Sequence, residues 1–438
     1  MLRSLRALLL FCAVFASYGF QWLLARVFGP RRLRARLERV HCKNARRLAR
    51  GFARLRGVFI KLGQVLSVIG TFLPKAYADE LERLQDQVPP RPFSEVEGRL
   101  HEAFGENALS LFENFEREPL AAASLAQVHR ARSRDGRELA VKVLYPGIEE
   151  LIRLDLAVLR SILPVVKRLI TVSRIERVLD QVEVMLQKET NYAQERANIE
   201  RIRAIFAGRE DIVVPDVVEE LTRGGVLSMS YETGTKITDF EGLSAAGIDT
   251  EAVAKMLVEA YFAMLFEHSV FHADPHPGNF LVRPGPRLVI LDYGAVFDVT
   301  PALADGMRRV VMGALARDDE QILNGLERMG FVSETGDREL LSQVGKEYLQ
   351  VLANVKIQDF SKLDRRAVAQ LRGRLREVMK NVEYPEGFFY VERTIALLFG
   401  LVGRLAPKHG LPGVVGPHAA VMFARALAVQ PAAPAHEA

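Results

Sequence analysis

Three short segments in a fixed order constrain the fold of this 438-residue chain more than any other feature. Residues 137–144 alternate in polarity, which predicts a strand whose lysine, Lys142, lies on the face opposite the leucine and valines. A Pro-rich loop then carries Asp274 and Asn279, five residues apart. Asp292 follows, directly before a Tyr-Gly pair. Four polar residues are therefore expected on one strand and two loops.

These four residue types match the tasks of a kinase-type site. A strand lysine neutralises phosphate oxygens, and a loop aspartate orients an attacking hydroxyl and accepts its proton. An asparagine and an aspartate before glycine offer the hard oxygen ligands that Mg²⁺ prefers. One such motif is common by chance, as turn and surface polar residues, but four in order on the right elements are specific. The sequence predicts a site for ATP or ADP with Mg²⁺, with Lys142 and Asp274 as catalytic residues and Asn279 and Asp292 as metal ligands.

Two histidines in the same loop have the i, i+4 spacing of a zinc pair, His272 and His276. Pro275 and Pro277 forbid a helix there, and the glutamate of an HExxH motif is missing. We expect both histidines to bond loop carbonyls instead.

Hydrophobic periodicity predicts a mixed chain. Strands are expected at 125–131, 137–144, 226–231, 280–282 and 288–291. Helices are expected at 58–88, 93–116, 152–163, 175–186, 251–268 and through 301–425. The first two strands are joined by a turn at 133–136.

The N-terminal run from Ala7 to Leu24 holds 18 residues without a charge, which is the lower limit for a helix that spans a bilayer. It could be a membrane anchor or interfacial helix, a cleaved signal peptide, or a buried helix of the fold. Because more arginines follow the run than precede it, the positive-inside rule keeps the main body on the cytoplasmic side of a bacterial inner membrane, or the matrix side in a mitochondrion.

Positive charge is concentrated at the N-terminus. Residues 1–61 hold 15 Lys/Arg against the single acid Glu38, so they carry +14 while the other residues carry −9 of the total of +5. Residues 30–56 are either a solvated helix face or a surface for anionic lipid headgroups. Few aromatics and no nucleic-acid-binding motif accompany the arginines, so we expect no nucleic acid partner.

Two cysteines are present, Cys12 and Cys42, and neither belongs to a CxxC pair. A thiolate zinc site is therefore excluded. We expect two reduced thiols, as in a cytosolic or matrix-facing domain.

Three further segments resemble the UbiB/AarF family of atypical kinase-like proteins, from about residue 55 to about 330. Lys61, Gly63 and Gln64 match the KxGQ signature of the family. A second segment resembles the Ala-rich loop that replaces the Gly-rich loop of kinases, at Leu120, Ala121, Ala122, Ala123, Ser124, Leu125, Ala126, Gln127 and Val128. Alanine restricts positive φ, so this loop should be stiffer and hold phosphates differently.

The third segment resembles the ExD motif and the glutamate that follows it. The resemblance implies that Glu195 pairs with Lys142 and that Glu189 faces the Lys61 helix. Asn191 stands where the family has aspartate, and on one straight helix Glu189 and Asn191 would point about 200° apart. Other departures are a tyrosine in the Asp-Phe-Gly motif and the lack, in the last 40 residues, of an uncharged run as long as the N-terminal one, where bacterial relatives usually carry membrane helices.

The resemblance implies an α+β, two-lobed protein-kinase-like fold with an N-terminal helical extension and a largely helical C-lobe. The expected parts are a 1–29 apolar segment, a 30–116 basic helical extension, a 117–235 N-lobe with inserted helices, a 236–428 C-lobe and a 429–438 disordered tail.

The leading hypothesis is a Mg-dependent ATPase or small-molecule kinase that supports ubiquinone or isoprenoid lipid biosynthesis at a membrane. The implied partners are nucleotide, anionic lipid, isoprenoid lipid precursors, and a biosynthetic complex or a homodimer. The alternative is a catalytically weak nucleotide-binding scaffold, and the KxGQ extension disfavours a true protein kinase.

Overall fold

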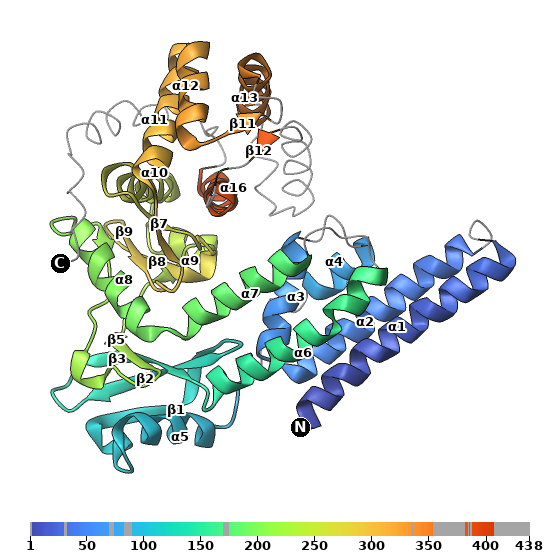
Figure 1. Ribbon diagram of the computed structural model, residues 1–438. Coiled ribbons are helices and arrows are strands. Elements are labelled where there is room, and N and C mark those ends of the chain that lie inside the picture. Colours follow the sequence, from blue (N-terminus) through green and yellow to red (C-terminus); the bar gives the residue numbers. More distant parts are fainter. Residues whose placement is uncertain are drawn as a thin grey trace, which may run out of the picture. The chain divides into compact units, whose positions relative to one another are not determined.

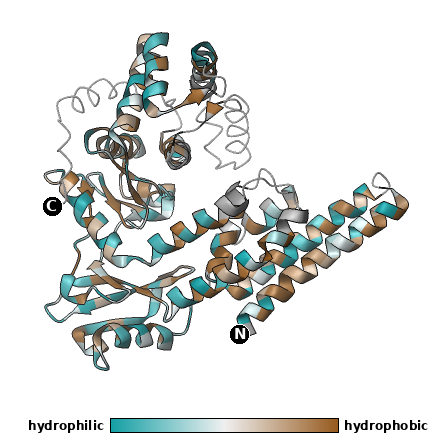
Figure 2. Cartoon of the chain, in the orientation of Figure 1, coloured by the Kyte–Doolittle hydropathy of each residue, from teal (hydrophilic) through white to brown (hydrophobic). Residues whose placement is uncertain are grey.

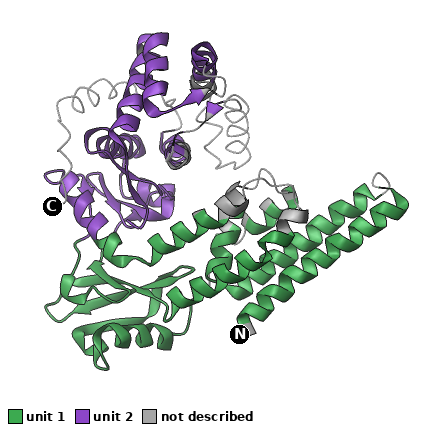
Figure 3. Cartoon of the chain, in the orientation of Figure 1, with its two compact units in different colours: residues 1–196, 216–231 green, residues 197–215, 232–438 purple. Residues whose placement is uncertain are grey.

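The chain folds into two compact units in a computed structural model (Figures 1 and 3). Unit 1 comprises residues 1–196 and 216–231, and unit 2 comprises residues 197–215 and 232–438. The structure describes residues 2–29, 33–69, 74–82, 90–169, 175–333, 337–353, 382–383, 385 and 388–406. The tail predicted at 429–438 and much of the helix predicted through 425 lie outside these residues.

Unit 1 begins with a helical region. The helices there are α1 (Leu2–Phe28), α2 (Arg34–Leu55), α3 (Val58–Ile69) and α4 (Lys75–Glu82). A bend separates α2 from α3, where Arg56 and Gly57 both have positive φ, 56° and 55°. Phe11 of α1 packs on Phe52 of α2 and Phe59 of α3, with ring centroids 6.2 and 6.5 Å away. Three helices therefore share one aromatic core.

A four-stranded antiparallel sheet follows, in the order β1-β2-β3-β5. Its strands are β1 (Phe112–Ala122), β2 (Ala126–Ser133), β3 (Glu138–Leu144) and β5 (Val226–Ser230). Helix α5 (Phe93–Phe104) packs its Val96 and Leu100 into a core with the leucine and valines of β3. The predicted alternation is confirmed, since these β3 residues are fully buried while Lys142 is partly exposed.

The helix predicted over 93–116 is wrong in its second half. It ends at Gly105, whose φ of 88° an L-residue rarely adopts. A short 3₁₀ turn, Ala108–Leu111, then leads into β1.

Long helices join the sheet to the rest of unit 1. They are α6 (Ile148–Leu169), α7 (Ile175–Thr190) and α8 (Tyr192–Ile205), the last of which continues into unit 2. A 3₁₀ turn, Glu219–Leu221, precedes β5.

Unit 2 holds small sheets among helices. A four-stranded sheet has the order β4-β9-β8-β6, and two-stranded ladders pair β10 with β7 and β11 with β12. The strands are β4 (Ile212–Val213), β6 (Thr235–Lys236), β7 (Val270–His272), β8 (Phe280–Arg283), β9 (Arg287–Ile290), β10 (Val296–Asp298), β11 (Val332–Ser333) and β12 (Val382–Glu383). The helices are α9 (Phe240–Ala245), α10 (Thr250–Phe262), α11 (Pro301–Ala316), α12 (Asp319–Met329), α13 (Arg338–Ala353) and α16 (Phe388–Leu405).

Two of these helices approach closely because glycines face each other. A Cβ at Gly306 of α11 would lie 2.5 Å from the carbonyl oxygen of Gly325 in α12. Helix α10 continues as a π-helical turn, Ala263–Glu267, which leads to β7.

Candidate functional site

The candidate residues divide between the two units. Lys142, Glu195, the KxGQ helix and the small-residue loop lie in unit 1, whereas Asp274, Asn279 and Asp292 lie in unit 2.

In unit 1, Lys142 and Glu195 form the ion pair that the resemblance implied. The Lys142 Nζ atom lies 2.8 and 2.9 Å from the two carboxylate oxygens of Glu195. The Glu195 side chain is 1% exposed and that of Lys142 is 17% exposed. A buried carboxylate is tolerated because both of its oxygens accept from an ammonium group. The pair fixes the strand lysine at a defined position.

A second ion pair joins the KxGQ helix to α7. Lys61 of α3 contacts Glu189 near the end of α7, and both side chains are partly exposed. Gly63 is buried in α3, and the Gln64 side chain lies outside the described residues.

Asn191 separates these two glutamates. Helix α7 ends at Thr190 and α8 begins at Tyr192, so the stretch is not one straight helix. The Asn191 side chain accepts a hydrogen bond from the backbone N–H of Gln194 at 3.0 Å, as an N-cap does. Glu189 therefore faces α3 while Glu195 faces β3. Because aspartate caps helices as well as asparagine does, this departure from the family pattern leaves the break intact.

The small-residue loop is a hairpin tip between β1 and β2. Leu120, Ala121 and Ala122 end β1, and Ala126, Gln127 and Val128 begin β2, so the loop itself is Ala123–Leu125. The Ala123 amide donates to the Ala126 carbonyl at 2.8 Å. Among the described residues, the non-glycine positions with positive φ are Arg56, Ser269 and Arg317, so the loop contains none. Alanine fits this backbone without strain.

A buried hydrogen-bond network braces the hairpin from below. Gln127 is 1% exposed, and its Oε1 accepts from the Tyr145 hydroxyl at 3.1 Å and from the Arg91 amide. The Tyr145 amide donates to the Leu125 carbonyl at 3.0 Å. Burial raises the pKa of Tyr145 to about 12, so its hydroxyl remains a donor. The sequence analysis did not find this network.

Gln127 also contacts His129, whose ring fixes its orientation. The Gln127 Nε2 group lies 3.1 Å from His129 Nε2, and His129 Nδ1 lies 2.9 Å from the Glu116 carbonyl. Burial lowers the pKa of His129, which favours the neutral ring. A carbonyl only accepts, so Nδ1 donates and Nε2 accepts from Gln127.

In unit 2, a hairpin brings Asn279 and Asp292 together. Strands β8 and β9 pair with Phe280 opposite Ile290. Asn279 precedes β8, and its carbonyl accepts from the Leu291 amide at 3.0 Å. Asp292 is the next residue, so both candidate metal ligands lie at the open end of one hairpin. The Asp292 carboxylate accepts from the Gly294 amide at 3.0 Å.

Asp274 is held to the same place by Asn279. The Asn279 Nδ2 group donates to the Asp274 carboxylate and to its carbonyl, at 3.1 Å each. The Asp274 carboxylate is partly exposed. The five-residue spacing thus produces a direct contact between the candidate base and a candidate metal ligand.

His272 links this loop to the buried core of unit 2. Its Nε2 lies 2.6 Å from the Asp292 carbonyl, which can only accept, and its Nδ1 lies 3.0 Å from the Tyr261 hydroxyl. Burial and the nearby Asp274 charge raise the pKa of Tyr261 well above its usual value. The prediction that His272 bonds a loop carbonyl is confirmed.

The expectation for His276 is wrong. Its exposed side chain accepts from the Gly278 amide at 3.1 Å rather than bonding a carbonyl, which caps the 3₁₀ turn Pro277–Asn279. The Pro residues that prevent a helix leave this amide without an intrahelical acceptor.

Two more residues of unit 2 support the site. Asn198 of α8 donates from Nδ2 to the Tyr293 carbonyl at 2.8 Å. Thr394 of α16 donates to the Ala273 carbonyl at 3.0 Å and is fully buried. The sequence offered a signal only for Asn198, which lies three residues after Glu195.

The donor set fits Mg²⁺ better than a metal held by protein alone. Within the described residues, no group of three or more His, Cys, Asp and Glu side chains could enclose a metal ion. Mg²⁺ commonly takes one or two protein oxygens and completes its shell with phosphates and water. Both cysteines are free, as expected, and both are exposed.

The first helix has the length and composition of a membrane span. Among the described residues, the segment Arg3–Phe28 is the one helix that meets these criteria, and 22% of its most apolar window is buried. The protein-kinase-like α+β fold is thus preceded by an apolar helix.

Known proteins are similar to this chain in sequence. AarF domain-containing protein kinase 1 of Xenopus laevis is 33% identical over 296 residues, which are 66% of this chain and 57% of that protein. The chloroplastic protein ACTIVITY OF BC1 COMPLEX KINASE 8 of Arabidopsis thaliana is 31% identical over 409 residues. That alignment covers 86% of this chain and 53% of the plant protein, so the chain spans about half of its length.

Among solved structures, Rv3197 of Mycobacterium tuberculosis in complex with erythromycin has a similar fold. Its TM-score is 0.55 and its identity 24%, with 86% of this chain and 93% of that chain covered. A sequence model of the ABC1 atypical kinase-like domain matches residues 83–326. The chain therefore belongs to the ABC1/AarF family of atypical kinase-like proteins.

Proposed function

We propose that this protein is a Mg-dependent ATPase or small-molecule kinase that supports ubiquinone or isoprenoid lipid biosynthesis at a membrane. The observation that carries the proposal is the Lys142–Glu195 pair, because a strand lysine held by a helix glutamate is what phosphoryl transfer in kinases requires.

The residues of unit 1 would bind and orient the nucleotide. Lys142 neutralises phosphate oxygens, and Glu195 keeps its ammonium group in place. The Ser124 and Leu125 amides of the tip would offer N–H groups to phosphates, since the Ala123 amide donates to the Ala126 carbonyl, and the Gln127 network limits the movement of the tip. A stiff tip favours one nucleotide geometry over several.

The residues of unit 2 would hold the metal and the proton. Asn279 and Asp292 supply oxygen ligands to Mg²⁺, which neutralises charge on the phosphates when it is bound. The Asp274 carboxylate accepts the proton of the attacking water or hydroxyl. Its contact with Asn279 Nδ2 leaves one carboxylate oxygen for that task.

Phosphate release from Mg·ATP by the purified protein tests the proposal, with and without anionic lipid and quinone-precursor analogues. We expect Asp292→Asn to reduce turnover by about 100-fold or more, as when a charge-stabilising group is removed from an active site. Asp298→Asn is the matched control, because this exposed carboxylate pairs with Arg201 in the same unit. Unchanged turnover in Asp292→Asn would refute the metal site.

A catalytically weak scaffold is the second candidate function. The glycine-free hairpin tip favours it, since a stiff loop that binds nucleotide tightly also releases product slowly. Tight Mg-dependent binding of ATP or ADP with no turnover under any condition would support the scaffold.

A further inference from the structure

The outer face of α1 is apolar along its whole length. Leu5, Leu9, Phe20, Leu23 and Val27 recur at helical spacing and are 52%, 59%, 54%, 53% and 69% exposed. Figure 2 shows hydrophobic residues along α1 from one end to the other. Soluble proteins rarely leave so long an apolar stripe in water.

Several polar side chains of α1 point the opposite way, into the protein, whereas Arg6 and Arg26 are exposed. Three of them bond α2: Ser17 to Asn44 at 3.1 Å, Tyr18 to His41 at 2.7 Å and Gln21 to Arg36 at 3.0 Å. At the start of the helix, Arg3 binds the buried Asp155 of α6. Helix α1 therefore buries several of its polar side chains together with Ala7, Phe11 and Val14 and exposes an apolar stripe, which suits a helix that faces lipid.

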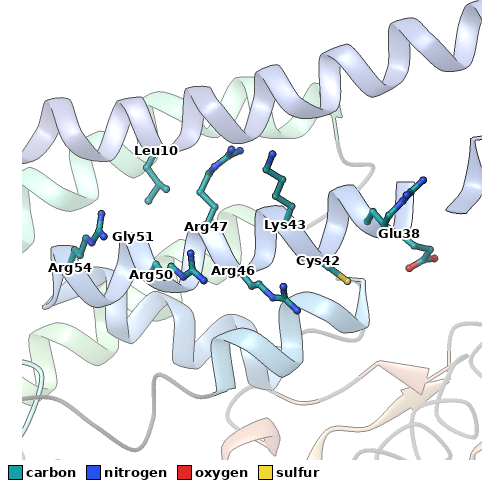
Figure 4. Close-up of a pocket in the computed structure, with 10 residues that line it drawn as sticks. Leu10, Glu38, Cys42, Lys43, Arg46, Arg47, Arg50, Gly51 and Arg54 are labelled. Atoms are coloured by element: carbon teal, nitrogen blue, oxygen red, sulfur yellow. The ribbon is translucent and has the colours of Figure 1, made fainter. Parts of the chain in front are cut away.

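Beside this helix, α2 presents a row of cations along a groove of about 730 Å³ (Figure 4). The residues that line it are Leu10, Glu38, Arg39, Cys42, Lys43, Arg46, Arg47, Arg50, Gly51 and Arg54. Six of these are basic and one is acidic. Leu10 of α1 forms one wall and rests on Gly51, where an added Cβ would overlap the Leu10 side chain. The apolar face and the basic groove therefore adjoin.

The contacts between α1 and α2 restrict how α1 can enter a bilayer. Contacts from Leu10–Gly51 to Gln21–Arg36 join the two helices along most of their length. If α1 crossed the membrane with its partner attached, α2 would bring the groove arginines into the hydrocarbon, where each is costly. If α1 lies flat, its apolar face enters the lipid and the groove remains at headgroup depth.

We propose that the intact α1–α2 hairpin lies in the plane of an anionic bilayer and binds lipid phosphates in the α2 groove. The inference rests on the membrane association in the proposed function and specifies its geometry. The occupant is an anionic phospholipid surface, because the outer face is apolar and the adjoining groove is cationic.

Depth measurements test the geometry. One fluorescent label is placed at the native Cys12 in a chain that carries Cys42→Ser. Three further single-label variants carry Leu5→Cys, Leu23→Cys or Val27→Cys in a chain without the native cysteines. Residues 5 and 27 of a helix are about 33 Å apart along its axis, comparable to the ~30 Å hydrocarbon core. Quenching by lipids that carry a quencher at known acyl depths reports each position.

We expect all four labels at the same shallow depth, near the boundary of headgroups and acyl chains. Labels that pass through the bilayer centre would show a spanning helix and overturn the proposal. Labels unquenched by lipid but quenched by a second labelled copy would also overturn it and assign the face to a dimer.

A charge reversal tests the groove. We expect the variant Arg39→Glu, Lys43→Glu, Arg50→Glu to bind vesicles of phosphatidylcholine with phosphatidylglycerol about 100-fold more weakly. Its control reverses three exposed cations outside the hairpin, Arg134→Glu, Lys255→Glu and Arg287→Glu, and should bind normally. Equal loss in both variants would refute a dedicated groove.

The same binding experiment on vesicles of phosphatidylcholine alone separates the contribution of lipid charge from that of apolar insertion. The groove variant and the native chain should bind these uncharged vesicles equally weakly. Circular dichroism spectra check that both variants fold. Depth and binding are read without nucleotide, so absent ATP turnover would refute the proposed function and leave this inference intact.

Discussion

The candidate residues of unit 1 and those of unit 2 are held in different ways. In unit 1, ion pairs join distant elements, Lys142 with Glu195 and Lys61 with Glu189. In unit 2, loop residues a few positions apart bond one another and the backbone, and His272 anchors them to the core.

This difference matters for how each set of residues can change. An ion pair between distant elements holds only while both elements keep their places, so the position of Lys142 depends on how β3 and α8 are arranged. The contacts of Asp274 and Asn279 lie within a few residues of one loop and depend less on such an arrangement. The expected consequence is that a shift of α8 changes the position of the unit 1 lysine and leaves the local arrangement of the unit 2 loop unchanged.

The largest effect is expected when the buried pair of unit 1 is broken. Lys142→Met leaves the Glu195 carboxylate buried without its cation, which should lower the free energy of unfolding by about 3–5 kcal/mol. Adding Glu195→Gln should restore much of the loss, as measured by urea denaturation of both variants. If adding Glu195→Gln restores no stability, packing rather than charge determines the loss in the Lys142→Met variant.

The next effect concerns Arg3, which holds α1 by the same kind of pair. Its Nε and Nη2 atoms lie 2.9 and 2.5 Å from the Asp155 carboxylate, which is 1% exposed. Arg3→Met should cost about 2–3 kcal/mol at neutral pH, less than a fully buried pair because Arg3 is 27% exposed.

This loss should depend on pH. Burial raises the pKa of Asp155, and the Arg3 guanidinium offsets part of that rise. Without Arg3 the folded state binds the proton more tightly than the unfolded state, so stability falls as pH rises through the raised pKa. The penalty should shrink in acid, and a pH-independent penalty would contradict an electrostatic cause.

A smaller effect is expected for the anchor of unit 2. His272→Phe keeps the ring but removes the bonds to Tyr261 and Asp292, which should cost about 2 kcal/mol. Tyr261→Phe is the control that removes one bond and leaves the Asp292 contact. If the Asp292 contact of His272 keeps the unit 2 loop in place, only His272→Phe should weaken Mg-dependent nucleotide binding. Calorimetry would measure this binding.

The smallest stability effect belongs to the partly exposed Lys61–Glu189 pair of α3 and α7. Lys61→Met should change the free energy of unfolding by less than about 1 kcal/mol, since water screens exposed pairs. Nucleotide affinity should respond more than stability if the arrangement of the unit 1 helices determines the position of Lys142. A change confined to stability would show that Lys61 is a structural residue only.

The elements with a clear hydrophobic pattern could be predicted from the sequence. The alternation of β3 located Lys142, and the short strands at 280–282 and 288–291 located the hairpin of Asn279 and Asp292. Strand β1 was missed because it is a bulged edge strand with Pro119, mostly exposed on both faces, so it shows no alternation.

The supporting contacts could not be read from the sequence. Gln127 meets Arg91 and Tyr145, 36 and 18 residues away, only because the hairpin register places them together. The break at Asn191 depends on one cap hydrogen bond, which periodicity does not reveal.

The pair of Arg3 and Asp155 also has a practical consequence for protein production. Removing an apolar N-terminal helix is a common route to a protein that stays in solution. Here the cut would expose the aromatic core and leave the Asp155 carboxylate without its counter-ion. A shortened chain that also carries Asp155→Leu should express better than one shortened alone, so the design of the truncation should start in α6.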